Sequence, residues 1–105
     1  MKRQNKVLTK EEIFDALRKH GDILLKYKVK EIGLFGSFVR GEQDDRSDID
    51  FIANFEEPSI DNFMGLSSFL ENLFGKKVEI LTPAGVDSIR INHVKEEIKR
   101  SIIYA

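Results

Sequence analysis

The chain has 105 residues, of which 41% are hydrophobic and 33% charged, and we interpret residues 1–105 as one domain of ordinary size. Its 17 basic and 18 acidic residues leave a net charge of −1, which excludes the strong positive field of a non-specific nucleic-acid binder, so direct nucleic-acid binding is not expected. Cysteine is absent, which excludes disulfides, thiol catalysis and thiolate metal sites.

The basic N-terminal segment Met1–Lys6 is not followed by an apolar stretch of the kind a signal peptide carries. No apolar run approaches the roughly 20 residues that a membrane-spanning helix requires. We therefore expect a cytoplasmic protein that does not associate with membranes.

The first expected element is a helix after Thr9, because Glu12 stands at the capping-box position. Gly21–Asp22 are expected to interrupt or bend it. His20 falls on its apolar face and is interpreted as a packed histidine rather than a catalytic one. The apolar stripe of this region recurs at helical spacing and consists of Ile13, Leu17, Leu24 and Tyr27.

The rest of the chain predicts alternating strands and helices. Strands are expected at residues 29–35, 48–55 and 77–81, a single helical turn at 38–41, and a polar turn at 44–47. An amphipathic helix ends at Gly75, and a last helix follows the third strand. The apolar stripes of these two helices are Phe63, Leu66, Leu70 and Leu73, and then Ile91, Val94, Ile98 and Ile102. The predicted order is α-β-turn-β-α-β-α, a small α/β domain.

Two features of the middle of the chain suggest a site for a nucleoside triphosphate. Gly36-Ser37 forms a small-residue turn whose backbone N–H groups can contact phosphate oxygens. Asp48 and Asp50 follow ten residues later, and strand alternation places both side chains on one face, opposite Ile49. Such a carboxylate pair can hold the Mg²⁺ ions that accompany phosphates.

Glu79 can complete a cluster of three carboxylates if the third strand lies beside the second. Three close negative charges repel one another, so the cluster should require a divalent cation. Oxygen ligands favour Mg²⁺, with Mn²⁺ as an alternative. Arg40 is either a phosphate contact or a surface arginine paired with Glu42 or Asp44. The two histidines are not interpreted as metal ligands.

The segment Gly36-Ser37, ten residues, then Asp48-Ile49-Asp50 resembles the hallmark of the minimal nucleotidyltransferases, the smallest members of the DNA polymerase β-like superfamily. Arg40-Gly41, Ser47 and the pattern around Glu79 extend the resemblance to nearly the whole chain. Two positions depart from the family pattern: Glu79 replaces the more usual aspartate, and Phe38 stands where arginine is common. Arg40, or Lys76 and Lys77, are candidates to replace that missing phosphate contact.

The resemblance implies a small mixed β-sheet flanked by helices, the polymerase β-like palm fold. It implies binding of ATP with two Mg²⁺ ions and transfer of AMP, with Asp48, Asp50 and Glu79 as metal ligands and Gly36, Ser37 and Arg40 at the nucleotide. Stand-alone proteins of this kind resemble antitoxins that adenylylate a tyrosine of a HEPN-domain toxin. A partner or a second copy would then complete the shallow cleft.

Two other interpretations stay open at this point. The chain could be a catalytically weak nucleotide-binding module that neutralises its partner by binding alone, as the departures at Phe38 and Glu79 would allow. Transfer to a small molecule or an RNA end is less favoured, because such enzymes normally carry an additional substrate-binding domain.

Overall fold

The computed structural model describes residues 8–105, so the basic segment Met1–Lys6 lies outside the described part. The elements are α1 (Lys10–Lys19), α2 (Gly21–Lys26), β1 (Val29–Phe35), α3 (Ser37–Arg40), β2 (Ile49–Phe55), α4 (Ile60–Phe74), β3 (Val78–Leu81), α5 (Pro83–Asp87), α6 (Asn92–Ser101) and β4 (Ile103–Tyr104). They confirm the predicted α/β class and the order of its main elements. Among residues 8–105, no helix is both long and apolar enough to cross a membrane.

The four strands form one mixed sheet in the order β3-β2-β1-β4. β1 pairs antiparallel with both β2 and β4, whereas β2 and β3 run parallel. A parallel pair requires a long crossover connection, and α4 supplies it. The mixed sheet flanked by helices is therefore as the sequence predicted.

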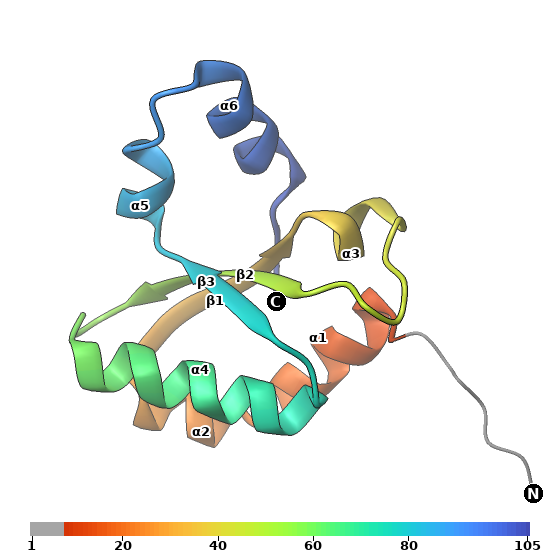
Figure 1. Cartoon of the computed structure of the whole chain (residues 1–105). Helices are drawn as coiled ribbons and strands as arrows, with labels where there is room; N and C mark the ends of the chain where they lie inside the picture. Colours follow the sequence, from red (N-terminus) through yellow and green to blue (C-terminus); the bar gives the residue numbers. More distant parts are fainter. Residues whose placement is uncertain (1–7) are drawn as a thin grey trace, which may run out of the picture.

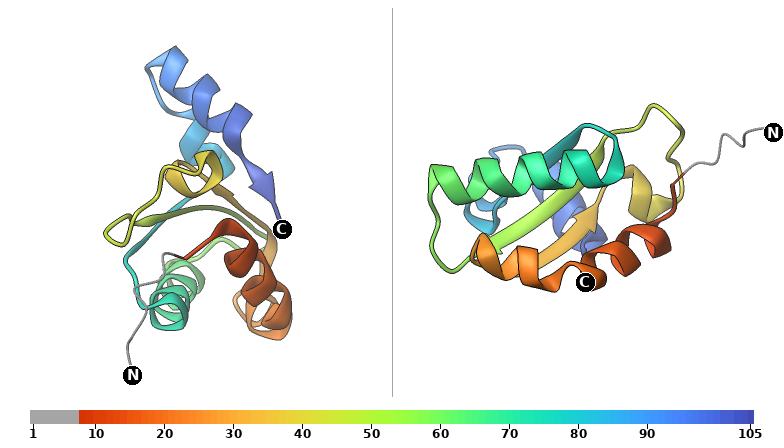
Figure 2. Two further views of the ribbon diagram at one scale, coloured as in Figure 1. Left: turned by 90° about the vertical axis from the view of Figure 1, so that its right-hand side faces the viewer. Right: turned by 90° about the horizontal axis from the view of Figure 1, so that it is seen from below.

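Helices cover the two faces of the sheet unequally (Figure 1). α1, α2 and α4 lie on one face, and α5 and α6 lie on the other. The two further views show α6 standing away from the layer of α1, α2 and α4 on the opposite side of the strands (Figure 2). The larger apolar core lies under α1 and α4, and it includes Ile49 and Phe51 of β2, both 0% exposed.

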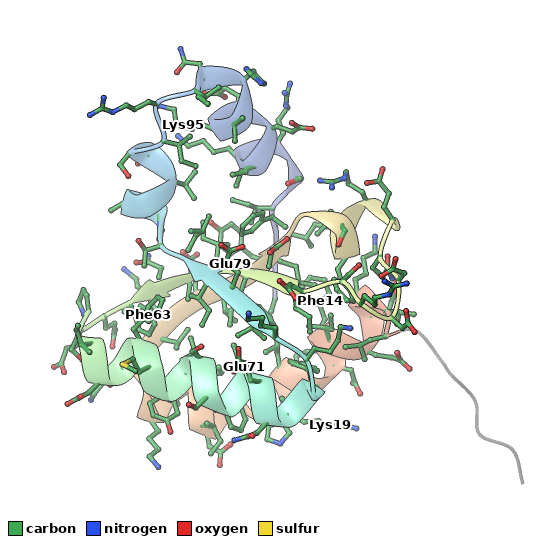
Figure 3. The ribbon with its side chains drawn as sticks, in the orientation of Figure 1. Phe14, Lys19, Phe63, Glu71, Glu79 and Lys95 are labelled. Carbon is green, nitrogen blue, oxygen red and sulfur yellow. The ribbon has the colours of Figure 1, made fainter. Side chains whose placement is uncertain are left out.

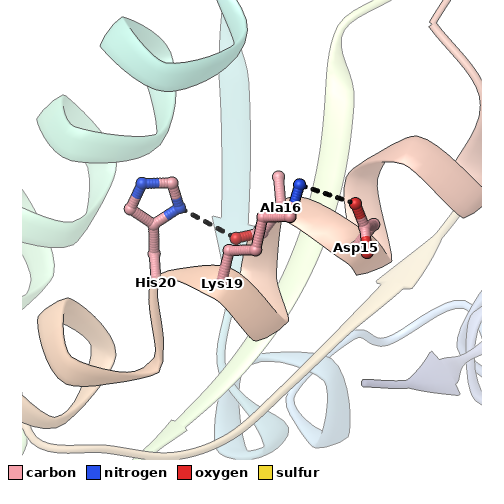
Figure 4. Close-up of polar contacts among 4 residues, drawn as sticks. All are labelled: Asp15, Ala16, Lys19 and His20. Atoms are coloured by element: carbon pink, nitrogen blue, oxygen red, sulfur yellow. Dashed lines mark hydrogen bonds and ion pairs between the residues drawn. The ribbon is translucent and has the colours of Figure 1, made fainter.

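The N-terminal helices form where the sequence predicts them. Thr9 and Glu12 make a reciprocal capping box, with the Glu12 amide donating to the Thr9 hydroxyl at 3.2 Å. α1 ends before His20, whose Nδ1 donates to the Ala16 carbonyl at 2.9 Å, and an ion pair joins Lys19 to Asp15 at 3.3 Å (Figure 4). The His20 ring also packs edge-on against the Phe69 ring, with 5.4 Å between the ring centroids, which confirms the interpretation of a packed histidine.

Two short elements near the C-terminal end were not predicted. Thr82 caps α5 by accepting a hydrogen bond from the Gly85 amide at 3.1 Å, with Pro83 at the first helical position. α6 ends at Ser101, one residue before the expected Ile102, and the chain then pairs with β1 as β4. This pairing is close because Gly33 has no side chain: a Cβ there would meet the backbone of Ile103 and the ring of Tyr104.

Candidate active site

The parallel register of β2 and β3 brings two of the predicted carboxylates together. Asp50 and Glu79 are direct partners across the two strands. Their side chains share a face with Ile52 and Leu81, which pack under α5 and α6, whereas Ile49 and Phe51 point to the other core. Figure 3 shows Glu79 on the sheet and Glu71 on α4 below it. The predicted neighbourhood of the second and third strands is therefore confirmed.

Asp50 has the most perturbed acidity of the site. Its pKa is raised from 3.8 to about 6, mainly by partial burial and also by the negative charges of Glu79 and Asp48 and a hydrogen bond with the Glu79 side chain. Arg40 opposes the shift only weakly. A carboxyl group that retains its proton near pH 6 beside another carboxylate is typical of a site that lacks sufficient positive charge of its own.

Asp48 lies just before β2 and is exposed, outside the Asp50–Glu79 pair. Its charge still reaches Asp50, because it contributes to the raised pKa of that residue. Within residues 8–105, no three histidine or acidic side chains are grouped closely enough to form a metal site. The structure thus pairs Asp50 with Glu79 and leaves Asp48 beside them.

Gly36 is required at the turn for two reasons. Its φ of 80° lies in the left-handed region that favours glycine. In addition, the space that a Cβ would occupy is filled by the Asp50 carboxylate. The glycine of the Gly-Ser motif therefore allows a catalytic candidate on β2 to lie directly against the end of β1.

Ser37 and Phe38 begin the single turn of α3, which starts directly after Gly36. Ser37 is half-buried, so it remains beside the turn as predicted. Phe38 is only 1% exposed and packs in the core under α1 and α4. The departure from arginine at this position therefore places a core residue where the family pattern has a charge.

Arg40 adopts the paired arrangement that was one of its two interpretations. Its Nε donates to Glu42 Oε1 at 2.9 Å, and this hydrogen bond is the largest cause of its raised pKa. The charges of Glu97 and Asp50 act on it in the same direction, so Arg40 is also close to the carboxylate site. Release from the exposed Glu42 would leave the guanidinium available to an anion.

A pocket of about 220 Å³ separates Arg40 and the Gly36 turn from α6. The sequence does not indicate that α6 belongs to the site, because neither its apolar stripe nor its charges show which strand it covers. Glu97 and Ser101 are the polar residues that α6 adds to this pocket. Its full lining is Phe35, Gly36, Arg40, Val94, Glu97, Ile98 and Ser101.

The donor set of the site fits a hard divalent cation. Asp50 and Glu79 offer only carboxylate oxygens, which are the ligands that Mg²⁺ and Mn²⁺ prefer. A cation would also neutralise the repulsion that raises the pKa of Asp50. Asp50 and Glu79 are therefore the paired carboxylates that would meet such a cation, with Asp48 beside them.

Comparison with known proteins first gives the class. A family model described as nucleotidyltransferase domain matches residues 11–105, and the chain belongs to this family. Within it, the chain is 45% identical over 100 residues to "Putative protein adenylyltransferase MJ1379" of Methanocaldococcus jannaschii, covering 91% of this chain and 97% of that protein. It is 36% identical over 100 residues to the protein adenylyltransferase MntA of Thermococcus cleftensis, covering 93% and 97%.

Solved structures support the fold. A structure described as a minimal nucleotidyltransferase superposes with a TM-score of 0.70 at 24% identity, covering 91% of this chain and 95% of that one. A chain from the complex of a tri-AMPylated Shewanella oneidensis HEPN toxin with an MNT antitoxin superposes with a TM-score of 0.53 at 17% identity, covering 83% and 66%. At these identities the likeness establishes the fold alone.

Proposed function

We propose that this chain transfers AMP from ATP to a hydroxyl group of a partner protein. The observation that carries the proposal is the pairing of Asp50 and Glu79 across β2 and β3, directly against the Gly36 turn. Nucleotidyl transfer requires negative ligands for a cation next to a surface that accepts phosphate, and this arrangement supplies both.

In the proposed reaction, the acceptor oxygen forms a bond to the α-phosphorus of ATP while the bond from that phosphorus to the bridging oxygen of the β-phosphate breaks. Pyrophosphate leaves, and the proton of the acceptor hydroxyl is released to solvent. Bound Mg²⁺ would polarise the phosphate oxygens and lower the pKa of the attacking hydroxyl. Asp48, Asp50 and Glu79 would hold the cation in place, so no separate protein base is needed.

The other residues of the site would bind the nucleotide. Gly36 and Ser37 would receive the terminal phosphates at the turn. Arg40 would leave Glu42 and neutralise charge that develops on the phosphates. The pocket below α6 lies beside these groups and would hold another part of the nucleotide or the acceptor.

The proposed partner is a HEPN-domain toxin, and the proposed acceptor is a tyrosine on it. The sequence relative MntA is a protein adenylyltransferase, and one structure of this fold comes from a complex with an AMPylated HEPN toxin. We therefore propose that the chain acts as the antitoxin of such a pair.

The decisive experiment incubates the purified chain with ATP labelled at the α-phosphate, Mg²⁺ and a HEPN-domain protein from the same genome. We expect a covalent label on the partner, and none when Asp48 and Asp50 are both replaced by asparagine. A matched control replaces Glu56 and Glu57 by glutamine, because these exposed residues follow the opposite end of β2 and carry the same charge. Neutralisation of the partner without any label would instead identify a binding module.

Mg²⁺ dependence is tested in the same assay by replacing it with Mn²⁺ or Ca²⁺. We expect Mn²⁺ to support transfer and Ca²⁺ to support binding without efficient transfer, because Ca²⁺ adopts looser coordination geometry. Equal transfer in the presence of a chelator would contradict the assigned role of the three carboxylates.

A further inference from the structure

The loop between α3 and β2 carries Asp48, the one proposed ligand that lies outside the β-sheet. Its centre is a compact turn in which the Asp44 amide donates to the Ser47 hydroxyl at 2.9 Å and the Arg46 amide donates to the Asp44 carboxylate at 2.9 Å. The Ser47 amide also donates to the Asp44 carbonyl at 3.2 Å. Asp48 follows directly after this turn, so the position of its carboxylate depends on where the turn is held.

Lys76, which lies between α4 and β3, makes a hydrogen bond to this turn. Its Nζ donates to the backbone carbonyl of Asp45 at 2.9 Å, across 31 residues of sequence. Lys76 is half-buried, although the contact itself is exposed to solvent. The hydrogen bond is charge-assisted, and such bonds are stronger than those between neutral groups.

The next residue provides a second connection. The Lys77 carbonyl accepts a hydrogen bond from the Ile49 amide at 3.1 Å. Asp48 therefore lies between two contacts made by consecutive residues, one to the turn before it and one to the strand after it. Gly75, in the left-handed conformation at the end of α4, directs the chain into this position.

The same segment leads into β3 and therefore carries Glu79. The connection Gly75–Lys77 thus sets the position of Asp48 relative to Glu79, although Asp48 lies in the loop before β2 and Glu79 lies in β3. We propose that Lys76 is a positioning residue: by fixing the Asp45 carbonyl it holds Asp48 where it can share a cation with Asp50 and Glu79. This inference rests on the proposed function for its catalytic consequence, but the restraint on the loop can be tested by itself.

The test compares Lys76→Met with Lys76→Arg and with Lys77→Met. Methionine keeps much of the apolar stem but removes the donor, and arginine retains a donor. Lys77 is the matched control because it is an exposed lysine at the adjacent position, and within residues 8–105 its hydrogen bonds are made by its backbone and not by its side chain.

The first measurement is amide hydrogen exchange of residues 44–49 in the full chain without nucleotide. We expect Lys76→Met to accelerate exchange of this segment about three- to tenfold, as the loss of one hydrogen bond implies, whereas Lys77→Met leaves it unchanged. Equal exchange in Lys76→Met and the wild type would overturn the inference whatever the activity of the protein.

The second measurement is the magnesium-dependent affinity for an ATP analogue with a methylene group between the α- and β-phosphates, obtained by calorimetry. Lys76→Met should weaken it about three- to tenfold, Lys76→Arg should restore most of the loss, and Lys76→Met should add little in an Asp48→Asn background. Full additivity of the two substitutions would show that Lys76 does not act through Asp48. Loss of analogue binding by the wild type would count against the proposed function, while the exchange measurement would still decide the inference.

Discussion

The two faces of the sheet differ in how completely they are covered. The face under α1, α2 and α4 encloses a continuous apolar core in which Ile13, Leu34, Ile49, Phe51 and Leu66 are all at most 1% exposed. On the other face, the buried apolar cluster of the described residues 8–105 consists of Phe35, Ile52 and Val86 of α5, and the same face continues into Asp50 and Glu79.

One face of the sheet therefore supplies most of the stabilising core, and the other face carries the candidate active site. Strand β2 contributes to both, because its alternate residues point to opposite faces. Among residues 8–105 no charged side chain is buried, so the packing of the closed face does not depend on the state of the site. The open face keeps a half-buried carboxyl group beside another carboxylate, an arrangement that costs stability and that a fold would not retain for packing alone.

The largest expected effect compares two isoleucines of β2. Ile49→Ala should cost about 3–5 kcal/mol of unfolding free energy, because the cavity would be enclosed on all sides. Ile52→Ala should cost less, about 2–3 kcal/mol, because the smaller cover of α5 and α6 can relax into the space. Urea unfolding of the two variants measures the difference, and equal costs would contradict the contrast between the faces.

Gly36→Ala is expected to affect both stability and the site. The positive φ and the collision with the Asp50 carboxylate should cost about 1–3 kcal/mol. Gly41→Ala is a suitable control, because φ is also positive there but the space for a Cβ is open. Transfer should therefore fall much further in Gly36→Ala than in Gly41→Ala when both are assayed well below their melting temperatures. Similar activities would indicate that Asp50 does not depend on the turn.

Asp50→Asn should stabilise the protein at neutral pH. Because the folded-state pKa of Asp50 is about 6, above its ordinary value of 3.8, folding favours the protonated form. This favourable contribution is present below pH about 4 and is lost as the pH rises through about 6. At pH 8 the free energy of unfolding of the variant should exceed that of the wild type by about 1–2 kcal/mol, a value reduced for the partial exposure of the group. At pH 4 the two free energies should be equal.

Thermal unfolding across this pH range provides the measurement. At pH 8, added Mg²⁺ should make the wild type more stable than Asp50→Asn, because the wild-type carboxylate can bind the cation and asparagine binds it weakly. A gain in stability that is independent of pH would show that the negative charge of Asp50 does not cause the gain.

The smallest expected effect concerns the exposed pair between Arg40 and Glu42. Glu42→Gln should free the guanidinium for phosphate and lower the KM for ATP about two- to fivefold with little change in kcat, since exposed ion pairs contribute at most about 1 kcal/mol. Initial rates at varied ATP concentration test this. An increased KM would mean that Glu42 holds Arg40 in its working position.

Much of the site could be predicted because its determinants are local. The two-residue spacing of Asp48 and Asp50, the Gly36-Ser37 turn after an apolar strand, and the alternation around Glu79 each follow from one stretch of sequence. The face on which each carboxylate lies follows from those patterns. The position of the third strand beside the second was a condition of the hypothesis, and the register between Asp50 and Glu79 meets it.

The remaining features depend on contacts between distant residues, which no local pattern encodes. The pairing of Ile103–Tyr104 with β1 depends on the missing side chain of Gly33, about 70 residues earlier. α5 was not predicted because a proline that follows an apolar strand is typical of a strand end, whereas Pro83 is also the first residue of a helix. The contact between Lys76 and the Asp45 carbonyl likewise joins two polar segments that have no periodicity.

The late position of β4 has a consequence for the order in which the molecule assembles. β1 and β2 are separated by a short connection and can pair early, whereas β4 must return to Gly33 over most of the length of the chain. α6 immediately precedes β4, so this wall of the pocket beside Arg40 is fixed only when that distant pairing forms. During folding, the Asp50–Glu79 pair would therefore form before α6 is fixed beside it. The pocket between Arg40 and α6 would be completed last.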